Sequence, residues 1–181
     1  MRGRDKLLER LNTTPVLRLM AERALTVSPT FVTVPDLDHE RCAVLPDQVN
    51  LIAVPDASKG MSRSLCVGVN ALPDTATGVI ILPADMPDIT AGDLTHIKSN
   101  AEKTTALILR ATTQDAKPGH PIYFDRSLFP LFENLKGDRG AFSICADNVN
   151  QTEFIALNGQ RARLDLDTPE DWEMYRKTLA P

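Results

Sequence analysis

Residues 78–89 read GVIILPADMPDI, and this stretch decides the fold class. Its apolar run, closed by a proline, is typical of a strand buried on both faces in a parallel sheet. A Met-Pro pair then forces a turn just behind Asp85. Ligands of open α/β sheets bind at the carboxyl ends of the strands, so Asp85 is well placed to hold a hard cation and, through it, a phosphate. The alternative is a capping role for Asp85, but Thr90 is the better N-cap candidate for the next helix.

Length and charge limit the class of protein. A chain of 181 residues fits one domain, and we expect residues 1–181 to form it. The net charge of -4 is spread over interspersed acids and bases, without a long basic run, and aromatic residues make up only 5%. Both features argue against nucleic acid as a partner.

Targeting and redox signals favour the cytoplasm. No apolar run approaches the roughly 18 residues that a membrane helix requires, so we expect no membrane partner. The basic N-terminus lacks the apolar stretch of a signal peptide. The cysteines, at positions 42, 66 and 145, are isolated and odd in number, which fits neither a zinc site nor a disulfide framework.

Strand-like and helix-like segments alternate along the chain, which implies a parallel sheet covered by helices on both faces. The last helix has Thr168 as N-cap, a proline at its first position and two acids in its first turn. Expected strands span residues 30–34, 51–54, 79–82, 105–109, 154–157 and 162–164. Expected helices span residues 14–25, 38–44, 62–72, 94–101, 127–135, 141–146 and 168–179.

Five motifs, taken in order, resemble the MobA-like nucleotidyltransferases of molybdenum-cofactor biosynthesis, and most closely their CTP:molybdopterin cytidylyltransferase branch. Each motif is weak alone, but their joint order covers nearly the whole chain. They are RDKLL at 4–8, GMSRSL at 60–65, LPADMP at 82–87, GHP at 119–121 followed by Phe129 and GDRGA at 137–141, and RLDLDTPED at 163–171.

The resemblance implies a fold and a reaction. The expected fold is the α/β, Rossmann-like three-layer nucleotidyltransferase (nucleotide-diphospho-sugar transferase) fold with a mostly parallel sheet. The expected reaction is Mg²⁺-dependent transfer of CMP, or of GMP, from the nucleoside triphosphate to a phosphorylated acceptor, with release of pyrophosphate. CTP is the favoured donor and GTP the other, while molybdopterin is the favoured acceptor.

The start of the chain departs from the family pattern. The family opens with a strand and a Gly-rich loop ending in Arg-Met-Gly, and Met1 falls where that methionine stands. Relative to the family the domain is therefore N-terminally incomplete, through either a start further upstream or a truncation. Because the family's first strand lies in mid-sheet, two strands here should have unpaired edges. The backbone amides that cradle the triphosphate would be missing too.

Carboxylates are the candidate metal ligands. Nucleotidyl transfer uses an anionic phosphate as nucleophile, so the site must gather anions and stabilise charge rather than supply a strong base. We expect Asp85, Asp165 and Asp167 to bind Mg²⁺. The last two alternate along a strand-like segment, which would place both on one face. The alternative is a solvated strand end, with Asp167 helping to cap the last helix.

Nucleotide binding is assigned from the family positions. Lys6 would act in catalysis by neutralising the β- and γ-phosphates, although as a bare feature it is an ordinary surface lysine. Arg2 and Arg4 are weaker candidates. Gly60, Met61 and Ser64 open a helix where backbone amides could meet the base or ribose; the alternative is a plain helix start with Ser62 as N-cap.

Acceptor binding is assigned to His120 and Arg139. His120 lies in an expected turn, and Arg139 could bind the acceptor phosphate. The alternatives are a structural or exposed histidine and a surface arginine. Trp172 and Tyr175 are expected in the core or an interface.

Two further readings stay open. The chain could be a truncated, non-catalytic binding module that docks on a molybdoenzyme or a chaperone. It could also be a nucleotidyltransferase with a different phosphate acceptor, because the fold and the acids would look the same.

Overall fold

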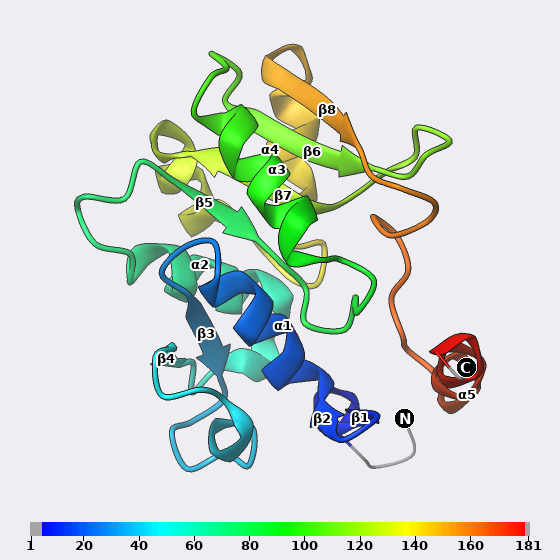
Figure 1. Ribbon diagram of the computed structural model, residues 1–181. Helices are drawn as coiled ribbons and strands as arrows, with labels where there is room; N and C mark the ends of the chain where they lie inside the picture. Colours follow the sequence, from blue (N-terminus) through cyan, green and yellow to red (C-terminus); the bar gives the residue numbers. More distant parts are fainter. Residues whose placement is uncertain (1–4, 180–181) are drawn as a thin grey trace.

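Three sheets organise the chain in the computed structural model, which describes residues 5–179 (Figure 1). The largest has the strand order β5-β7-β6-β8, and the other two are a parallel pair, β3-β4, and a short antiparallel hairpin, β1-β2. The strands are β1 (Arg10–Leu11), β2 (Thr14–Pro15), β3 (Phe31–Val34), β4 (Asn50–Ala53), β5 (Gly78–Ile81), β6 (Ile108–Thr112), β7 (Pro118–Asp125) and β8 (Thr152–Ala156).

Strand direction in the large sheet is mostly shared. β5, β6 and β8 run the same way, and β7 runs against them, so both ladders beside β7 are antiparallel. The turn expected at residues 119–121 was wrong, because this segment lies inside β7. Its glycine and its proline, which we took as turn signals, fall where the ladder with β6 is irregular, between Arg110 and Thr112.

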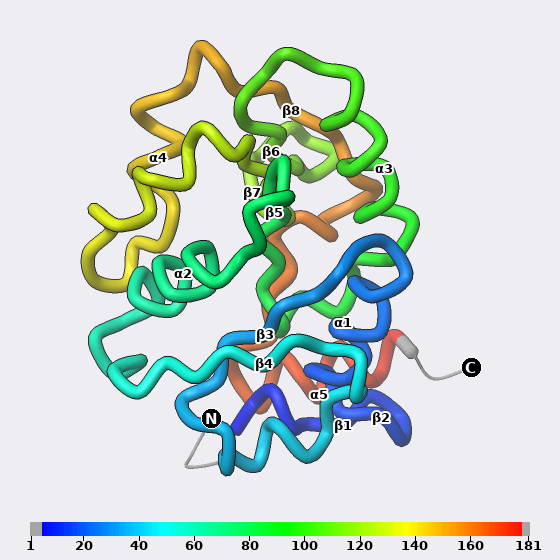
Figure 2. Tube along the Cα trace, turned by 90° about the vertical axis from the view of Figure 1, so that its left-hand side faces the viewer, coloured from blue at the N-terminus to red at the C-terminus, as the bar shows by residue number. Residues whose placement is uncertain are grey.

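Helices cover both faces of the large sheet, as Figure 2 shows. Alternate residues of β5 face opposite ways: Ile81 packs in the cluster that contains Phe124, whereas Ile80 packs in the one that contains Ile97. The three-layer expectation is thus confirmed. The α-helices are α1 (Val16–Leu25) and α3 (Ala91–Ala101) on one side, α2 (Met61–Asn70) and α4 (Phe142–Asp147) on the other, and the C-terminal α5 (Pro169–Leu179).

Short 3₁₀ helices replace two expected α-helices. Residues 38–44 form only η2 (Cys42–Val44), and residues 127–135 form η4 (Arg126–Asn134), which contains Pro130. Proline removes an N–H donor and disfavours α-helix, which accounts for the tighter form of η4. Three more 3₁₀ helices are η1 (Lys6–Leu8), η3 (Ala57–Lys59) and η5 (Val149–Gln151). Across residues 5–179, every helix is too short or too polar to cross a membrane.

Side-chain caps fix the starts of two helices. Thr90 and Asp93 form a capping box at α3, so the N-cap role falls to Thr90 and Asp85 is left free for other contacts. At α5 the Asp171 amide donates to Thr168 Oγ1 at 3.1 Å, and the Thr168 amide donates to the Asp171 carboxylate at 2.8 Å. Both predicted N-caps are confirmed.

The C-terminal helix packs against the start of the chain. Trp172 is buried in the cluster that contains Leu11 and Val16, and its Nε1–H donates to the Leu166 carbonyl at 3.1 Å. Arg176 binds Glu9 at 2.7 Å and lies over the Trp172 ring. Trp172 is therefore a core residue, as expected.

Two strand edges face a large cleft. Among the described residues β3 pairs only with β4 and β5 only with β7, so each strand has one open edge. The cleft, about 1250 Å³ in volume, is lined by residues 28–33 beside β3 and 75–85 along β5. These are the unpaired edges that the resemblance predicts.

Candidate functional site

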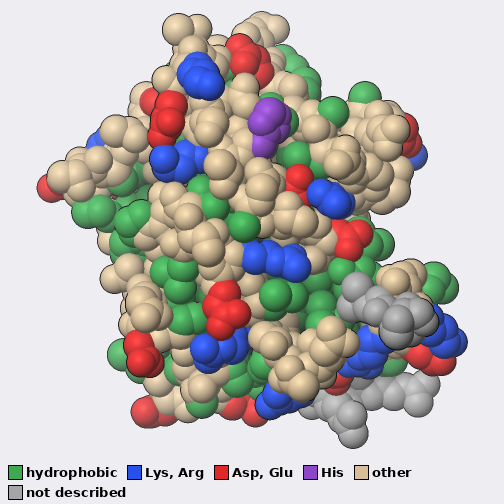
Figure 3. Space-filling view, in the orientation of Figure 1, with side chains coloured by type: hydrophobic (Ala, Val, Ile, Leu, Met, Phe, Trp, Pro, Cys, Tyr) green, Lys and Arg blue, Asp and Glu red, His purple; other side chains and the backbone are tan. Residues whose placement is uncertain are grey.

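The cleft contains most of the residues that the sequence singled out. It runs along β5 to the strand's carboxyl end and continues past the start of α2 to the loop after η4. Lys6, Met61, Ser64, Asp85, His120 and Arg139 all line it. On the face in Figure 3, acidic and basic side chains alternate, in keeping with the small net charge.

Lys6 joins two carboxylates at one end of the cleft. Its Nζ lies 2.5 Å from Asp85 Oδ2 and 2.5 Å from Asp167 Oδ1. The Leu166 amide donates to the Asp85 carbonyl at 3.1 Å, which brings the C-terminal segment beside the end of β5. Three distant parts of the chain therefore meet around one ammonium group.

Asp5 fixes the backbone that presents Lys6. It is the N-cap of η1, where its carboxylate accepts from the Leu7 amide at 3.0 Å. Arg41 binds the same carboxylate through two hydrogen bonds of 2.5 and 3.0 Å. Burial works to raise the pKa of Asp5, but the bonds from Arg41 and Leu7 outweigh it and lower that pKa. Asp5 thus stays charged and holds η1 in place.

The Lys6 ammonium is also held in its charged form. Partial burial works to lower its pKa, but the hydrogen bonds to Asp167 and Asp85 outweigh this and raise the pKa overall. Two carboxylates that share one cation are the arrangement that a divalent ion also stabilises. Mg²⁺ binds through one or two carboxylates plus substrate phosphates and water, so the pair Asp85 and Asp167 fits such an ion.

Asp165 does not join this pair. Residues 163–167 do not form the expected strand, nor do residues 162–164; the chain turns at 161–163 and continues without a ladder. Asp165 is exposed, and no group of three His, Cys, Asp or Glu residues suited to a metal occurs between residues 5 and 179. Alternation on one face, which we expected for Asp165 and Asp167, requires a strand, and residues 164–167 form none.

The start of α2 is built around Gly60, whose φ is +104°. A Cβ there would lie 2.5 Å from Asp138 Oδ1, so glycine is required. The Met61 amide donates to Asp138 Oδ1 at 3.2 Å, and the Ser62 amide donates to the Gly137 carbonyl at 3.1 Å. These two amides already have partners, which leaves the side chains of Met61 and Ser64 on the cleft wall.

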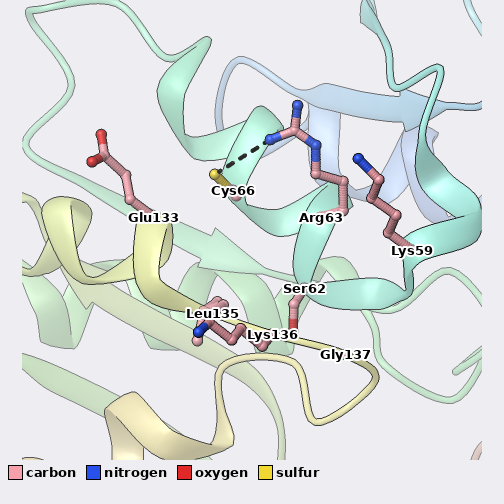
Figure 4. A pocket seen from close by; sticks show the side chains of 8 residues that line it. All are labelled: Lys59, Ser62, Arg63, Cys66, Glu133, Leu135, Lys136 and Gly137. Atoms are coloured by element: carbon pink, nitrogen blue, oxygen red, sulfur yellow. Dashed lines mark hydrogen bonds between the residues drawn. The ribbon is translucent and has the colours of Figure 1, made fainter.

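A second, smaller hollow of about 240 Å³ lies on the other side of α2 (Figure 4). Ser62 lines it, is almost fully buried and has no partner for its Oγ among the described residues. Lys59 and Arg63 point away from Ser62 in Figure 4 and bind Asp56 at 2.9 and 2.8 Å. Ser62 is therefore not the N-cap of α2; Gly60 takes that position.

His120 and Arg139 lie in the cleft beyond Asp85. Burial, together with the positive charge of Arg110, lowers the pKa of His120 to about 4, although Asp85 opposes the shift. His120 is thus neutral at physiological pH. Arg139 is exposed on the loop that follows η4.

Arg110 is a cleft residue that sequence reasoning missed. It lies in β6 and donates from Nε to the Gly119 carbonyl at 3.3 Å. A lone arginine inside an otherwise apolar and small-residue strand, LILRATT, was the signal that could have identified it. The weaker candidates Arg2 and Arg4 lie outside the described residues.

Comparisons with known proteins give a family and a fold. A family model described as the MobA-like NTP transferase domain matches residues 1–152. The purine catabolism protein PucB of Bacillus subtilis (strain 168) is 31% identical over 129 residues, which cover 69% of this chain. The chain spans about 60% of the length of that curated relative.

Solved structures share the fold at low identity. Rv0371c from Mycobacterium tuberculosis H37Rv, solved in complex with manganese, has a TM-score of 0.83 at 24% identity, over 97% of this chain and 93% of that one. CMP:2-keto-3-deoxy-manno-octonic acid synthetase complexed with CTP has a TM-score of 0.73 at 13% identity, over 96% and 91%. The nucleotide-diphospho-sugar transferase fold expected from the sequence is confirmed.

Proposed function

Because the chain belongs to the MobA-like NTP transferase domain family, we propose that it is a nucleotidyltransferase. It transfers CMP, or GMP, from the nucleoside triphosphate to a phosphorylated acceptor and releases pyrophosphate. The observation that carries this proposal is the Lys6 ammonium held between Asp85 and Asp167 at the carboxyl end of β5. Ligands of open α/β sheets bind at that end of the strands.

The acids and the lysine divide the work on the triphosphate. Asp85 and Asp167 would hold Mg²⁺, which when bound supplies positive charge beside the phosphorus under attack. Lys6, kept protonated by the same two carboxylates, neutralises charge on the β- and γ-phosphates. The proposal leaves out Asp165, which the structure does not bring to this pair.

The two walls of the cleft receive the two substrates. Gly60 sets the start of α2, and Met61 and Ser64 of that helix face the nucleoside. CTP is favoured over GTP by the resemblance to the cytidylyltransferase branch. His120 and Arg139 face the acceptor, for which molybdopterin is the favoured molecule and another phosphorylated compound the alternative. The cysteine pattern supports a cytoplasmic location, where a molybdoenzyme or chaperone could receive the product.

Pyrophosphate release tests the proposal. The assay supplies CTP or GTP with Mg²⁺ and molybdopterin to this chain and to a version extended by upstream in-frame codons. We expect pyrophosphate release with CTP. Asp85→Asn should lower the rate at least ~100-fold, because the carboxylate that would hold the charge-stabilising Mg²⁺ is removed. Asp147→Asn, an exposed acid on α4, is the matched control and should retain activity.

The alternatives give different outcomes. Binding of Mg²⁺ and CTP without turnover in either version would favour the non-catalytic module. Turnover that requires another phosphorylated acceptor would keep the transferase and replace molybdopterin. Turnover unchanged in Asp85→Asn would contradict the proposed site itself.

A further inference from the structure

Arg110 is a partly buried cation on the wall of the cleft. It stands opposite Ile122 in the β6–β7 register, so its side chain shares a sheet face with Ile122. Arg110 and His120 both line the cleft. Its Nε–H donates to the Gly119 carbonyl at 3.3 Å. A guanidinium has five N–H donors, so one hydrogen bond leaves most of its capacity unused.

Three other cations that line the cleft have carboxylate partners, whereas Arg139, like Arg110, has no ion pair among the described residues but is exposed to solvent. Lys6 binds Asp85 and Asp167, Arg41 binds Asp5, and Lys98 binds Glu102. Within the part of the chain that the structure describes, no carboxylate lies within 4.0 Å of the Arg110 guanidinium. Holding a partly buried charge without a counter-ion is costly, and a bound anion removes that cost.

The surroundings set where such an anion would lie. Cys145 of α4 is close enough for the positive charge of Arg110 to act on its thiol, and His120 is close enough for both Arg110 and Asp85 to act on its ring. Arg110 lines the cleft together with His120, and it is partly buried where Arg139 is exposed. The neutral His120 ring beside it can donate one hydrogen bond to an anion oxygen and repels neither the anion nor the arginine.

The backbone beneath Arg110 is closely packed. A Cβ on Gly119 would lie 1.8 Å from the Ala162 carbonyl oxygen, so the start of β7 packs closely against residues 162–163. The His120 amide donates to the same Ala162 oxygen at 2.8 Å. The Gly119 carbonyl that accepts from Arg110 Nε is thus held by packing and a neighbouring hydrogen bond to Ala162.

We propose that Arg110 binds the phosphate group of the acceptor in the cleft that it lines together with His120. Arginine presents paired N–H groups that match two phosphate oxygens. This inference rests on the proposed function for the identity of the anion, because the acceptor's phosphate is the nucleophile. It adds a third acceptor-side residue, and it assigns to Arg110 the inner contact and to Arg139 the outer one.

Inorganic phosphate is the probe, and the His120 ring is the reporter. The chain has three histidines, so their ¹⁵N-labelled ring signals can be assigned with a His120→Gln variant. Phosphate is titrated at pH 7 against chloride of equal ionic strength. We expect a saturable shift of the His120 signal, with affinity weakened at least about tenfold in Arg110→Gln and less in Arg110→Lys.

Two controls make the result specific. Arg18→Gln removes an arginine of α1 that binds Glu22 outside the cleft and should leave the phosphate affinity within about twofold. Lys6→Gln should weaken binding of CTP with Mg²⁺ but leave the phosphate response of His120 intact. Far-UV circular dichroism checks that each variant is folded. The wild-type titration tests phosphate binding at His120 even if a variant does not fold.

The outcomes separate this inference from the proposed function. An absent His120 shift in the wild type, or the same phosphate affinity in Arg110→Gln, overturns the role of Arg110 even if CTP binds and turns over. Arg110-dependent phosphate binding in a protein that binds no CTP keeps the anion site and removes the nucleotidyl-transfer role.

Discussion

The Tyr175 hydroxyl donates a hydrogen bond of 2.6 Å to Asp88 Oδ1, across 87 positions of sequence. It ties α5 to the loop that carries Asp85 from the end of β5. The helix that buries Trp172 therefore also braces the acidic end of the cleft.

Tyr175→Phe should cost about 1 kcal/mol of unfolding free energy, because one partly buried hydrogen bond to a charged acceptor is lost. Urea unfolding followed by tryptophan fluorescence measures it. Burial and then the Asp88 bond raise the pKa of Tyr175, so its contribution is present below pH 10 and declines as the pH rises further. Tyr123→Phe is the control, since none of the hydrogen bonds of the described residues involves that hydroxyl. An equal loss in both variants would contradict the role of the Asp88 bond.

Removing Lys6 should increase the affinity of the free protein for a divalent ion. In Lys6→Gln the carboxylates of Asp85 and Asp167 lose their shared cation, and we expect Mn²⁺ to bind about tenfold more tightly than in the wild type. Mn²⁺ titration monitored by electron paramagnetic resonance measures this without nucleotide. The double variant Lys6→Gln/Asp85→Asn should lose the gain. Unchanged Mn²⁺ affinity in Lys6→Gln would argue against a metal site at this pair.

Gly119 and Gly92 should respond oppositely to alanine. A Cβ at Gly119 would meet the Ala162 backbone at 1.8 Å, so Gly119→Ala should destabilise the protein by at least about 2 kcal/mol. Gly92 lies inside α3 with its nearest neighbour at 3.5 Å, and Gly92→Ala should stabilise by about 0.5–1 kcal/mol. Thermal unfolding of both variants compares them. A tolerated alanine at Gly119 would show that residues 160–163 are not tightly packed there.

His120 should make stability depend on acidity. Its folded pKa of about 4 lies below the ordinary value of 6.5, so its contribution is complete above about pH 6.5 and is lost as the pH falls toward 4. The gap corresponds to about 3 kcal/mol. Urea unfolding at pH 7 and pH 4.5 should show a smaller difference in His120→Gln than in the wild type. His96→Gln, on exposed α3 surface, should behave as the wild type does, and equal pH dependence in all three would contradict the shift.

Local signals predicted much of this molecule, and long-range contacts explain what they missed. Thr90 and Thr168 cap their helices as expected, because a cap depends on residues within one turn of it. His120 was placed in a turn, because glycine and proline signal turns unless neighbouring strands impose a ladder. Asp85 and Asp167 were predicted as metal ligands from pattern and resemblance. The Lys6 ammonium between them was not predicted as their partner, because the two carboxylates lie 79 and 161 residues after Lys6 in the sequence, a separation that no local pattern encodes. Arg110 was missed because its unused donors are visible only when its neighbours in space are known.

The salt bridge between Lys6 and Asp167 has a consequence for the synthesis of the chain on the ribosome. While the ribosome is still adding residues 90–160, Lys6 and Asp85 have been made but Asp167, Trp172 and Arg176 have not. The acidic end of the cleft can therefore be completed only near the end of translation, and a nascent chain that stalls earlier exposes the apolar surface of Leu11 and Val16 that α5 would cover. Such chains would be substrates for chaperones and proteases rather than partially active enzymes.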